Sequence, residues 1–181
     1  MYSELRFLAA MLPVILFSLA VAPLSGQSDS PASVIIGPVF KGCENAPAEQ
    51  VDICCQRKML ESIYRNIRYP RQAREEGDQG TLVVQFTITK TGETANIEVI
   101  KSISHSCKDE VIRVVKELPR WIPATVDGEP VDAVVSLPVE YRLDGVPLKK
   151  RQQIAEASFD WNSLQGIVLQ RVIVTAYAAT R

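Results

Sequence analysis

Apolar residues recur along this chain with two different spacings, and the change from one to the other separates the predicted elements. From Asn45 to Ile67 they return about every four residues, which places them on one face of a helix. From Thr81 to Thr89 apolar and polar residues alternate, as in a strand with one buried face. Between the two, Tyr69-Pro70 ends the helix, because a residue before proline disfavours the helical conformation. Gly77 is expected to cap a short following turn in the left-handed conformation.

The alternating pattern continues after Gly92, which is predicted to form the tight turn of a hairpin. The second strand of this hairpin runs from Ala95 to Val99. A second amphipathic helix is predicted to start near Ser106 and to end at Pro119. Trp121, in the loop behind this helix, is interpreted as a residue that fills the core.

The last alternating stretch is predicted to be an edge strand. Its informative residue is Pro138, because a proline has no N–H for a ladder and belongs on an edge strand or at a bulge. An edge strand exposes backbone groups to which another chain can add. The candidate partner-binding residues are Val131, Asp132, Ala133, Val134, Val135, Ser136, Leu137, Pro138, Val139, Glu140, Tyr141, Arg142 and Leu143.

These elements predict an α+β domain over residues 45–143. We expect a small antiparallel sheet of about three strands with two helices packed on one face.

Composition excludes several functions. Twenty Lys and Arg against twenty-one Asp and Glu leave a net charge of −1, so we expect no nucleic-acid partner. His105 is the only histidine, and no Cys/His spacing suits a metal. We therefore predict no catalytic residues, no metal, no cofactor and no small-molecule substrate, and hence no enzyme.

The N-terminus carries a targeting signal. Residues 7–24 are almost wholly apolar and are followed by small polar residues, so residues 1–27 are predicted to be a secretory signal peptide. An uncleaved membrane anchor is the alternative, because about 18 apolar residues is the lower limit for crossing a bilayer. Residues 28–44 are expected to be a linker. In both cases the rest of the chain lies outside the cytoplasm.

Four cysteines in an oxidising compartment indicate disulfides, with three ways of pairing them. Cys54 and Cys55 are adjacent, and a bridge between neighbours is strained, so each is expected to pair elsewhere, with Cys43 and Cys107 as partners. A reactive dithiol at Cys54-Cys55 is the alternative, and it requires both thiols to be free.

A set of motif residues resembles the C-terminal domain of TonB-family proteins from about Tyr69 to Leu143. The motif residues are Tyr69, Pro70, Gly77, Gly80, Trp121 and Pro123. The resemblance implies a periplasmic domain that grips the TonB box of TonB-dependent outer-membrane receptors by strand addition beside Val131 to Leu143, contributing to transport across the envelope. The proline-rich spacer and the membrane histidine of full-length TonB are not found, so we expect a short form without independent force transduction. Contact with the ExbB/ExbD motor is expected only if residues 7–24 stay in the membrane.

The tail, residues 144–181, opens with a basic segment that is interpreted as a solvated linker. Near its end Val172, Ile173, Val174, Thr175 and Ala176 resemble a TonB box. The alternative is an ordinary strand that completes the protein's own sheet, or a disordered tail. If the resemblance holds, the tail can occlude its own edge or bridge to another copy. Two function classes follow: a receptor-docking module, or an envelope scaffold that forms homodimers through the same edge.

Overall fold

The structure, a computed structural model, describes residues 35–177. The predicted signal or anchor, the first part of the 28–44 linker and the last four residues of the tail lie outside the described residues. None of the helices within residues 35–177 is long and apolar enough to span a bilayer. The export and anchor hypotheses therefore stay predictions.

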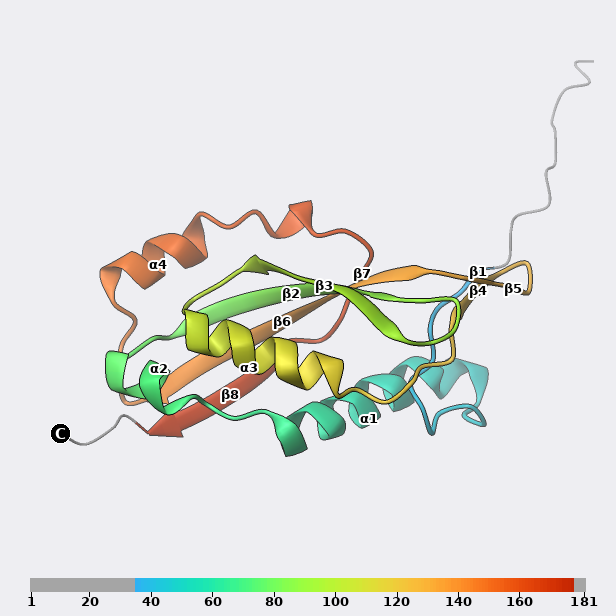
Figure 1. The fold of residues 1–181 in the computed structure, drawn as a ribbon, viewed down its shortest axis with the longest axis horizontal. Coiled ribbons are helices and arrows are strands. Elements are labelled where there is room, and N and C mark those ends of the chain that lie inside the picture. Colours follow the sequence, from blue (N-terminus) through green and yellow to red (C-terminus); the bar gives the residue numbers. More distant parts are fainter. Residues whose placement is uncertain (1–34, 178–181) are drawn as a thin grey trace, which may run out of the picture. The chain divides into compact units, whose positions relative to one another are not determined.

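Helices and strands both form the described part of the chain (Figure 1). The helices are α1 (Val51–Asn66), α2 (Arg71–Glu76), α3 (His105–Lys116) and α4 (Lys150–Ala157), with 3-10 turns η1 (Ala48–Gln50) and η2 (Trp161–Ser163). The strands are β1 (Ile35–Ile36), β2 (Gly80–Ile88), β3 (Thr94–Lys101), β4 (Ala124–Val126), β5 (Glu129–Val131), β6 (Ala133–Asp144), β7 (Ile167–Val168) and β8 (Val172–Tyr177).

The main sheet has five strands, and β6 lies inside it. The strand order is β3-β2-β6-β7, and β8 pairs with β6 on the same side as β7. The pairs β3-β2 and β2-β6 are antiparallel, whereas β7 and β8 run parallel to β6. A smaller sheet has the order β1-β4-β5. The α+β class is confirmed, but the sheet has more than the expected three strands, and the prediction that β6 is an edge strand is wrong.

The hydrophobic core lies between the sheet and two helices. Alternate residues of β2 and β6 point towards α1 and α3, as the period-two pattern predicts. The buried residues that form this layer include Met59, Ile63, Leu82, Val84, Phe86, Val111, Val115, Val135, Leu137, Val139 and Tyr141. Trp121 packs edge-on against Phe40 with ring centroids 4.8 Å apart, which confirms its role in the core. Figure 1 shows α4 on the opposite face of the sheet from α1.

Local chemistry explains where the elements begin and end. Gly77 ends α2 with φ 68°, and its N–H reaches the carbonyls of the last turn, as expected for a left-handed cap. The Tyr69 hydroxyl donates to the Asp78 carbonyl in the following loop. α3 begins two residues earlier than predicted, because Ser104 rather than Ser106 accepts the first-turn N–H.

One disulfide joins the N-terminal arm to α1. Cys43 and Cys54 are bridged, whereas Cys55 and Cys107 are free, so the expected second bridge is not formed. Burial raises the pKa of the Cys107 thiol to about 11. Because Cys54 is bridged, Cys54-Cys55 is not a free dithiol.

Candidate functional site: the tail-facing edge of β6

The two edges of β6 can be told apart by hydrogen bonds at its ends. The Leu143 N–H donates to Gln79 Oε1 at 2.8 Å, at the start of β2. The Ser136 carbonyl instead accepts from the Leu169 N–H at 2.8 Å, just behind β7. Because successive residues of a strand turn their N–H and C=O groups to alternate sides, odd-numbered residues of β6 face β2 and even-numbered residues face the tail. We call the tail-facing backbone groups of Ser136, Glu140, Arg142 and Asp144 the acceptor edge.

The chain's own tail fills this acceptor edge. β8 pairs with β6 in parallel from Val139↔Val172 to Asp144↔Tyr177 without a shift in register. The five residues that resemble a TonB box all belong to β8. Of the two alternatives for this segment, a strand that completes the protein's own sheet is the one found.

The tail pairing is interrupted opposite Pro138. β7 pairs with Val135 and Ser136, and β8 resumes at Val139. Residues 169–171 therefore face only two residues of β6, which makes a one-residue bulge in the tail. Pro138 is an even-numbered residue, so its nitrogen, which has no hydrogen to donate, points at this interruption. The proline marks a gap in one ladder and not the rim of the sheet.

Gly166 lets the tail approach β6 closely. Its φ is 73°, and a Cβ there would lie 2.1 Å from the Val134 carbonyl oxygen. Any side chain would therefore push β7 away from the sheet.

β8 is buried on one face and exposed on the other. Val172 is fully buried and Val174 is 8% exposed, and both join the core. Ile173 is 39% exposed and Tyr177 is 77% exposed. The Ile173 N–H donates to the Tyr64 hydroxyl on α1 at 3.1 Å, so it points away from β6. By the same alternation, the N–H groups of Val174 and Ala176 point towards β6 and that of Thr175 points outwards.

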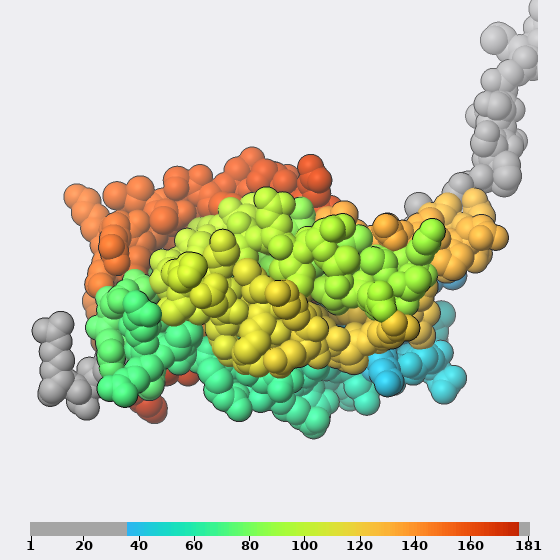
Figure 2. Space-filling view, in the orientation of Figure 1, coloured from blue at the N-terminus to red at the C-terminus, as the bar shows by residue number. Residues whose placement is uncertain are grey.

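The segment between β6 and β7, residues 145–166, crosses the back of the sheet, and we call it the strap. Figure 2 shows it as a band along one margin of the molecule. Glu156 on α4 accepts from the Thr81 N–H at 2.6 Å and pairs with Lys101 Nζ at 2.9 Å. Lys101 in turn lies over the rings of Phe159 and Trp161 at 5.1 and 5.3 Å. The basic segment is exposed, as expected for a solvated stretch, but it forms α4 and is fastened to the sheet through Glu156, so it is not a free linker.

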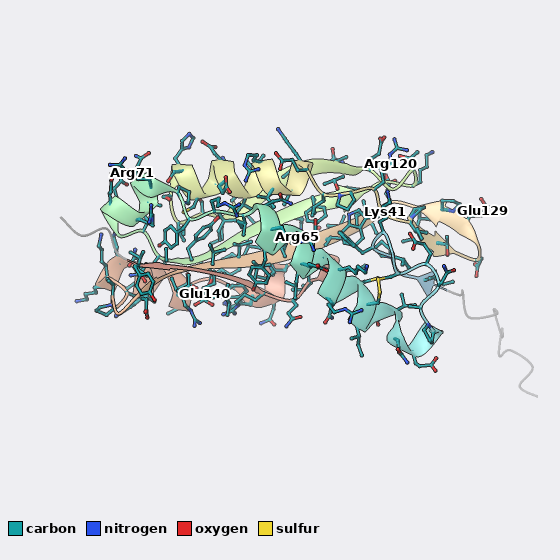
Figure 3. All side chains as sticks on the ribbon, turned by 90° about the horizontal axis from the view of Figure 1, so that it is seen from below. Lys41, Arg65, Arg71, Arg120, Glu129 and Glu140 are labelled. Atoms are coloured by element: carbon teal, nitrogen blue, oxygen red, sulfur yellow. A yellow bond between two sulfur atoms is a disulfide. The ribbon has the colours of Figure 1, made fainter. Side chains whose placement is uncertain are left out.

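A charge cluster lies where β8 begins. Glu140 Oε1 accepts from Arg142 Nε at 2.5 Å, and Glu140 Oε2 accepts from Arg171 Nη1 at 3.1 Å. Burial by itself raises the pKa of Glu140, but the hydrogen bonds from both arginines outweigh it, so its pKa lies below the ordinary value. Glu140 therefore stays charged at neutral pH. Figure 3 labels Glu140 beside the strands at the C-terminal end of the chain.

The other predicted residues are distributed over the fold. Val131 ends β5 in the small sheet, and Asp132, between β5 and β6, accepts from the Lys90 N–H at 2.7 Å. Tyr69 and Pro70 precede α2, Gly80 begins β2, and Pro123 precedes β4. The motif residues thus position β2 and β6, while the acceptor edge comes from β6 alone.

Sequence reasoning missed the contacts of the strap, which involve Lys101, Glu156 and Trp161. One signal was present: Phe159 and Trp161 stand in an otherwise polar segment, and their rings pack edge-on at 4.8 Å. Large aromatic side chains in a supposed solvated linker indicate packing against a surface.

Comparison with known proteins identifies part of the chain. Residues 65–143 match the family model of the Gram-negative bacterial TonB protein C-terminal. The chain is also similar to the NMR solution structure of the Helicobacter pylori TonB-CTD, at 26% identity over 50% of this chain and 95% of that chain, with a TM-score of 0.33. No curated protein matches.

Proposed function

Because residues 65–143 belong to the TonB C-terminal domain family, we propose that this chain is a protein-binding module of the cell envelope. In this proposal the module acts in the periplasm and docks on TonB-dependent outer-membrane receptors. A receptor segment adds as a strand along the acceptor edge of β6. The resting chain holds β8 on that edge, and the receptor segment takes its place.

The pairing of β8 with β6 carries this proposal. It is a strand addition within one chain: a short, uncharged, β-branched segment pairs with the even-numbered backbone groups of β6 over six residues. A foreign segment of the same kind can make the same ladder, since backbone groups do not depend on sequence.

Exchange of β8 is energetically reasonable. Releasing it exposes Val172 and Val174, at about 1.5–3 kcal/mol for each side chain, and also returns the hydrogen bonds of the β6-β8 ladder to water. An incoming strand with small apolar residues at the same positions regains this burial. The β3-β2-β6 ladders are formed without any backbone group of β8, although Val172 and Val174 do contribute to the core.

Binding of TonB-box peptides to the full chain tests the proposal. The full chain used for this test, which we call the host, carries Ala176→Pro. The Ala176 N–H points at β6, so its removal weakens the pairing of β8 with β6. Thr175→Pro is the matched control, since the Thr175 N–H points outwards. We expect Ala176→Pro to raise peptide affinity by about tenfold and Thr175→Pro to change it much less.

A proline moved along the peptide shows how the peptide binds. Strand addition predicts that affinity falls at every second position, because only alternate peptide N–H groups face β6. Uniform tolerance of proline, or no binding to either host, contradicts the proposal.

A second candidate function rests on the outer edge of β8. The Ile173 N–H of this edge donates to the Tyr64 hydroxyl. The residues of the edge are uncharged, and the side chains of Ile173 and Tyr177 are exposed. Unprotected edges of this kind favour pairing between copies, as in a homodimeric envelope scaffold. A sedimentation coefficient that rises with protein concentration, in the absence of any receptor, supports this candidate. A monomer at all concentrations rules it out.

A further inference from the structure

Arg171 lies directly ahead of β8 and has two partners outside the ladder. Its guanidinium reaches Glu140 Oε2 at 3.1 Å and lies 5.5 Å from the centre of the Trp161 ring. The Glu140 side chain is only 14% exposed, whereas that of Arg171 is 48% exposed. A largely buried carboxylate and an aromatic ring thus meet one cation supplied by the tail.

We infer that Glu140 and Trp161 form a guanidinium subsite beside the start of β8, and that the segment which replaces β8 carries an arginine directly ahead of its paired residues. This inference rests on the proposed function. Backbone pairing tolerates many sequences. The subsite adds a side-chain contact that selects the partner and fixes the register.

The subsite remains when β8 leaves, because the strap is fastened independently of β8. Glu156 is held by Thr81 and Lys101, and the Gln152 side-chain amide donates to the Gly77 carbonyl at 3.0 Å. These contacts keep η2, and with it Trp161, on the back of the sheet. Arg171 departs with β8, which leaves Glu140 with Arg142 as its cation.

The geometry favours arginine over lysine. A guanidinium is planar, so it can donate to a carboxylate and stack on a ring at the same time, whereas an ammonium is a strongly hydrated point charge. A cavity of about 350 Å³ lined by Glu140, Arg142, Arg171 and Glu156 gives a long side chain room beside the strand.

The test uses labelled peptides that copy residues 170–177, with Arg, Lys, Ala or Glu at the position of Arg171. They are titrated into the full chain carrying Ala176→Pro, with and without Glu140→Gln. We expect the Arg peptide to bind roughly five- to tenfold more tightly than the Ala peptide. The Lys peptide should lie between them and the Glu peptide should bind most weakly.

In the Glu140→Gln host the preference for the Arg peptide over the Ala peptide should fall to the smaller part that the Trp161 ring supplies. Equal binding of these two peptides to the host that retains Glu140 overturns the subsite but leaves strand addition intact. Absence of binding by all four peptides overturns the proposed function itself. The two failures are therefore distinguishable.

Hydrogen exchange tests the subsite in the chain with its own tail, where no added peptide has to bind. The Arg142 N–H faces β8. Arg171→Ala should speed its exchange roughly five- to tenfold, the factor expected for the affinity of the Arg peptide over the Ala peptide. Arg171→Lys should recover part of the protection. Unchanged exchange in Arg171→Ala contradicts the subsite, because the cation would then contribute nothing to docking of the tail.

Discussion

β6 pairs more extensively with β2 on one side than with β7 and β8 on the other. On one side β2 pairs with it from Gly80↔Tyr141 to Ile88↔Ala133 with no shift in register, and the side chains of both strands that face α1 and α3 are buried. On the other side β7 and β8 pair in parallel, the ladder breaks opposite Pro138, and only Val172 and Val174 of the six residues of β8 are buried. The β2-β6 pairing is therefore part of the fold itself, whereas β7 and β8 fill the remaining edge of β6.

Proline substitutions on β6 should break the two sides unequally. Val139→Pro removes an N–H that faces β2, and we expect a loss of about 3 kcal/mol or more in the free energy of unfolding. Arg142→Pro removes an N–H that faces β8, so the domain should still unfold cooperatively after the tail is released. Thermal melts followed by circular dichroism measure both variants. Equal losses contradict the distinction between the two sides.

A matched pair of buried valines sharpens the comparison. Val84 in β2 and Val172 in β8 are both fully buried in the same core, so truncation of either to alanine should lower global stability by about 2 kcal/mol. Only Val172→Ala should also ease the opening of β8, by about 30-fold in the exchange of the Arg142 N–H. If Val84→Ala has the same effect on this N–H, β8 does not open separately from β2.

Removal of the tail should expose the acceptor edge. Deletion of residues 171–181 is expected to raise the affinity for TonB-box peptides at least about tenfold, because no state with an occupied edge competes. A cooperative melt of the truncated chain is the control that its fold persists. Unchanged affinity in a folded variant removes the idea that the tail occludes its own edge.

Acid should weaken the docking of β8 slightly. The pKa of Glu140 is lowered in the folded chain from an ordinary value of 4.5, so its contribution is present above that pH and is lost as the pH falls through the folded pKa. Fluorescence of Trp161, which lies over Arg171, should therefore change below about pH 4.5. Glu140→Gln should remove this step, and a step that persists in the variant has another origin.

The elements within residues 45–143 could be predicted because each follows from a local rule. The period-two pattern of β2, the cap at Gly77 and the turn at Gly92 depend on residues close in sequence. The place of β6 in the sheet could not be predicted this way, because it depends on where a segment some 30 residues later lies. Pro138 also misled for a physical reason: a proline reports on one hydrogen-bonding position, and a bulge in the neighbouring strand satisfies it as well as an open edge does.

The candidate site was predicted in part. That residues 133–143 and 172–176 form strands could be predicted from their patterns, but the open rim expected on β6 is occupied by β8. The side-chain subsite was not found, since Glu140, Trp161 and Arg171 are brought together only by the path of the strap. The expectation for the cysteines was half correct: Cys43 and Cys54 are bridged, but Cys55 and Cys107 are free, because an even number of cysteines does not show which thiols lie close enough to pair.

Residue-resolved hydrogen exchange along β6 tests the central claim most directly, because one strand then reports on both of its neighbours. If β8 is an exchangeable occupant, the N–H groups of Glu140, Arg142 and Asp144 should exchange through local opening, with little dependence on denaturant. Those of Val139, Tyr141 and Leu143 should exchange only on global unfolding. Equal protection with the same denaturant dependence for both sets would show that β8 is an integral strand, and would contradict the account of a replaceable tail on a receptor-binding edge.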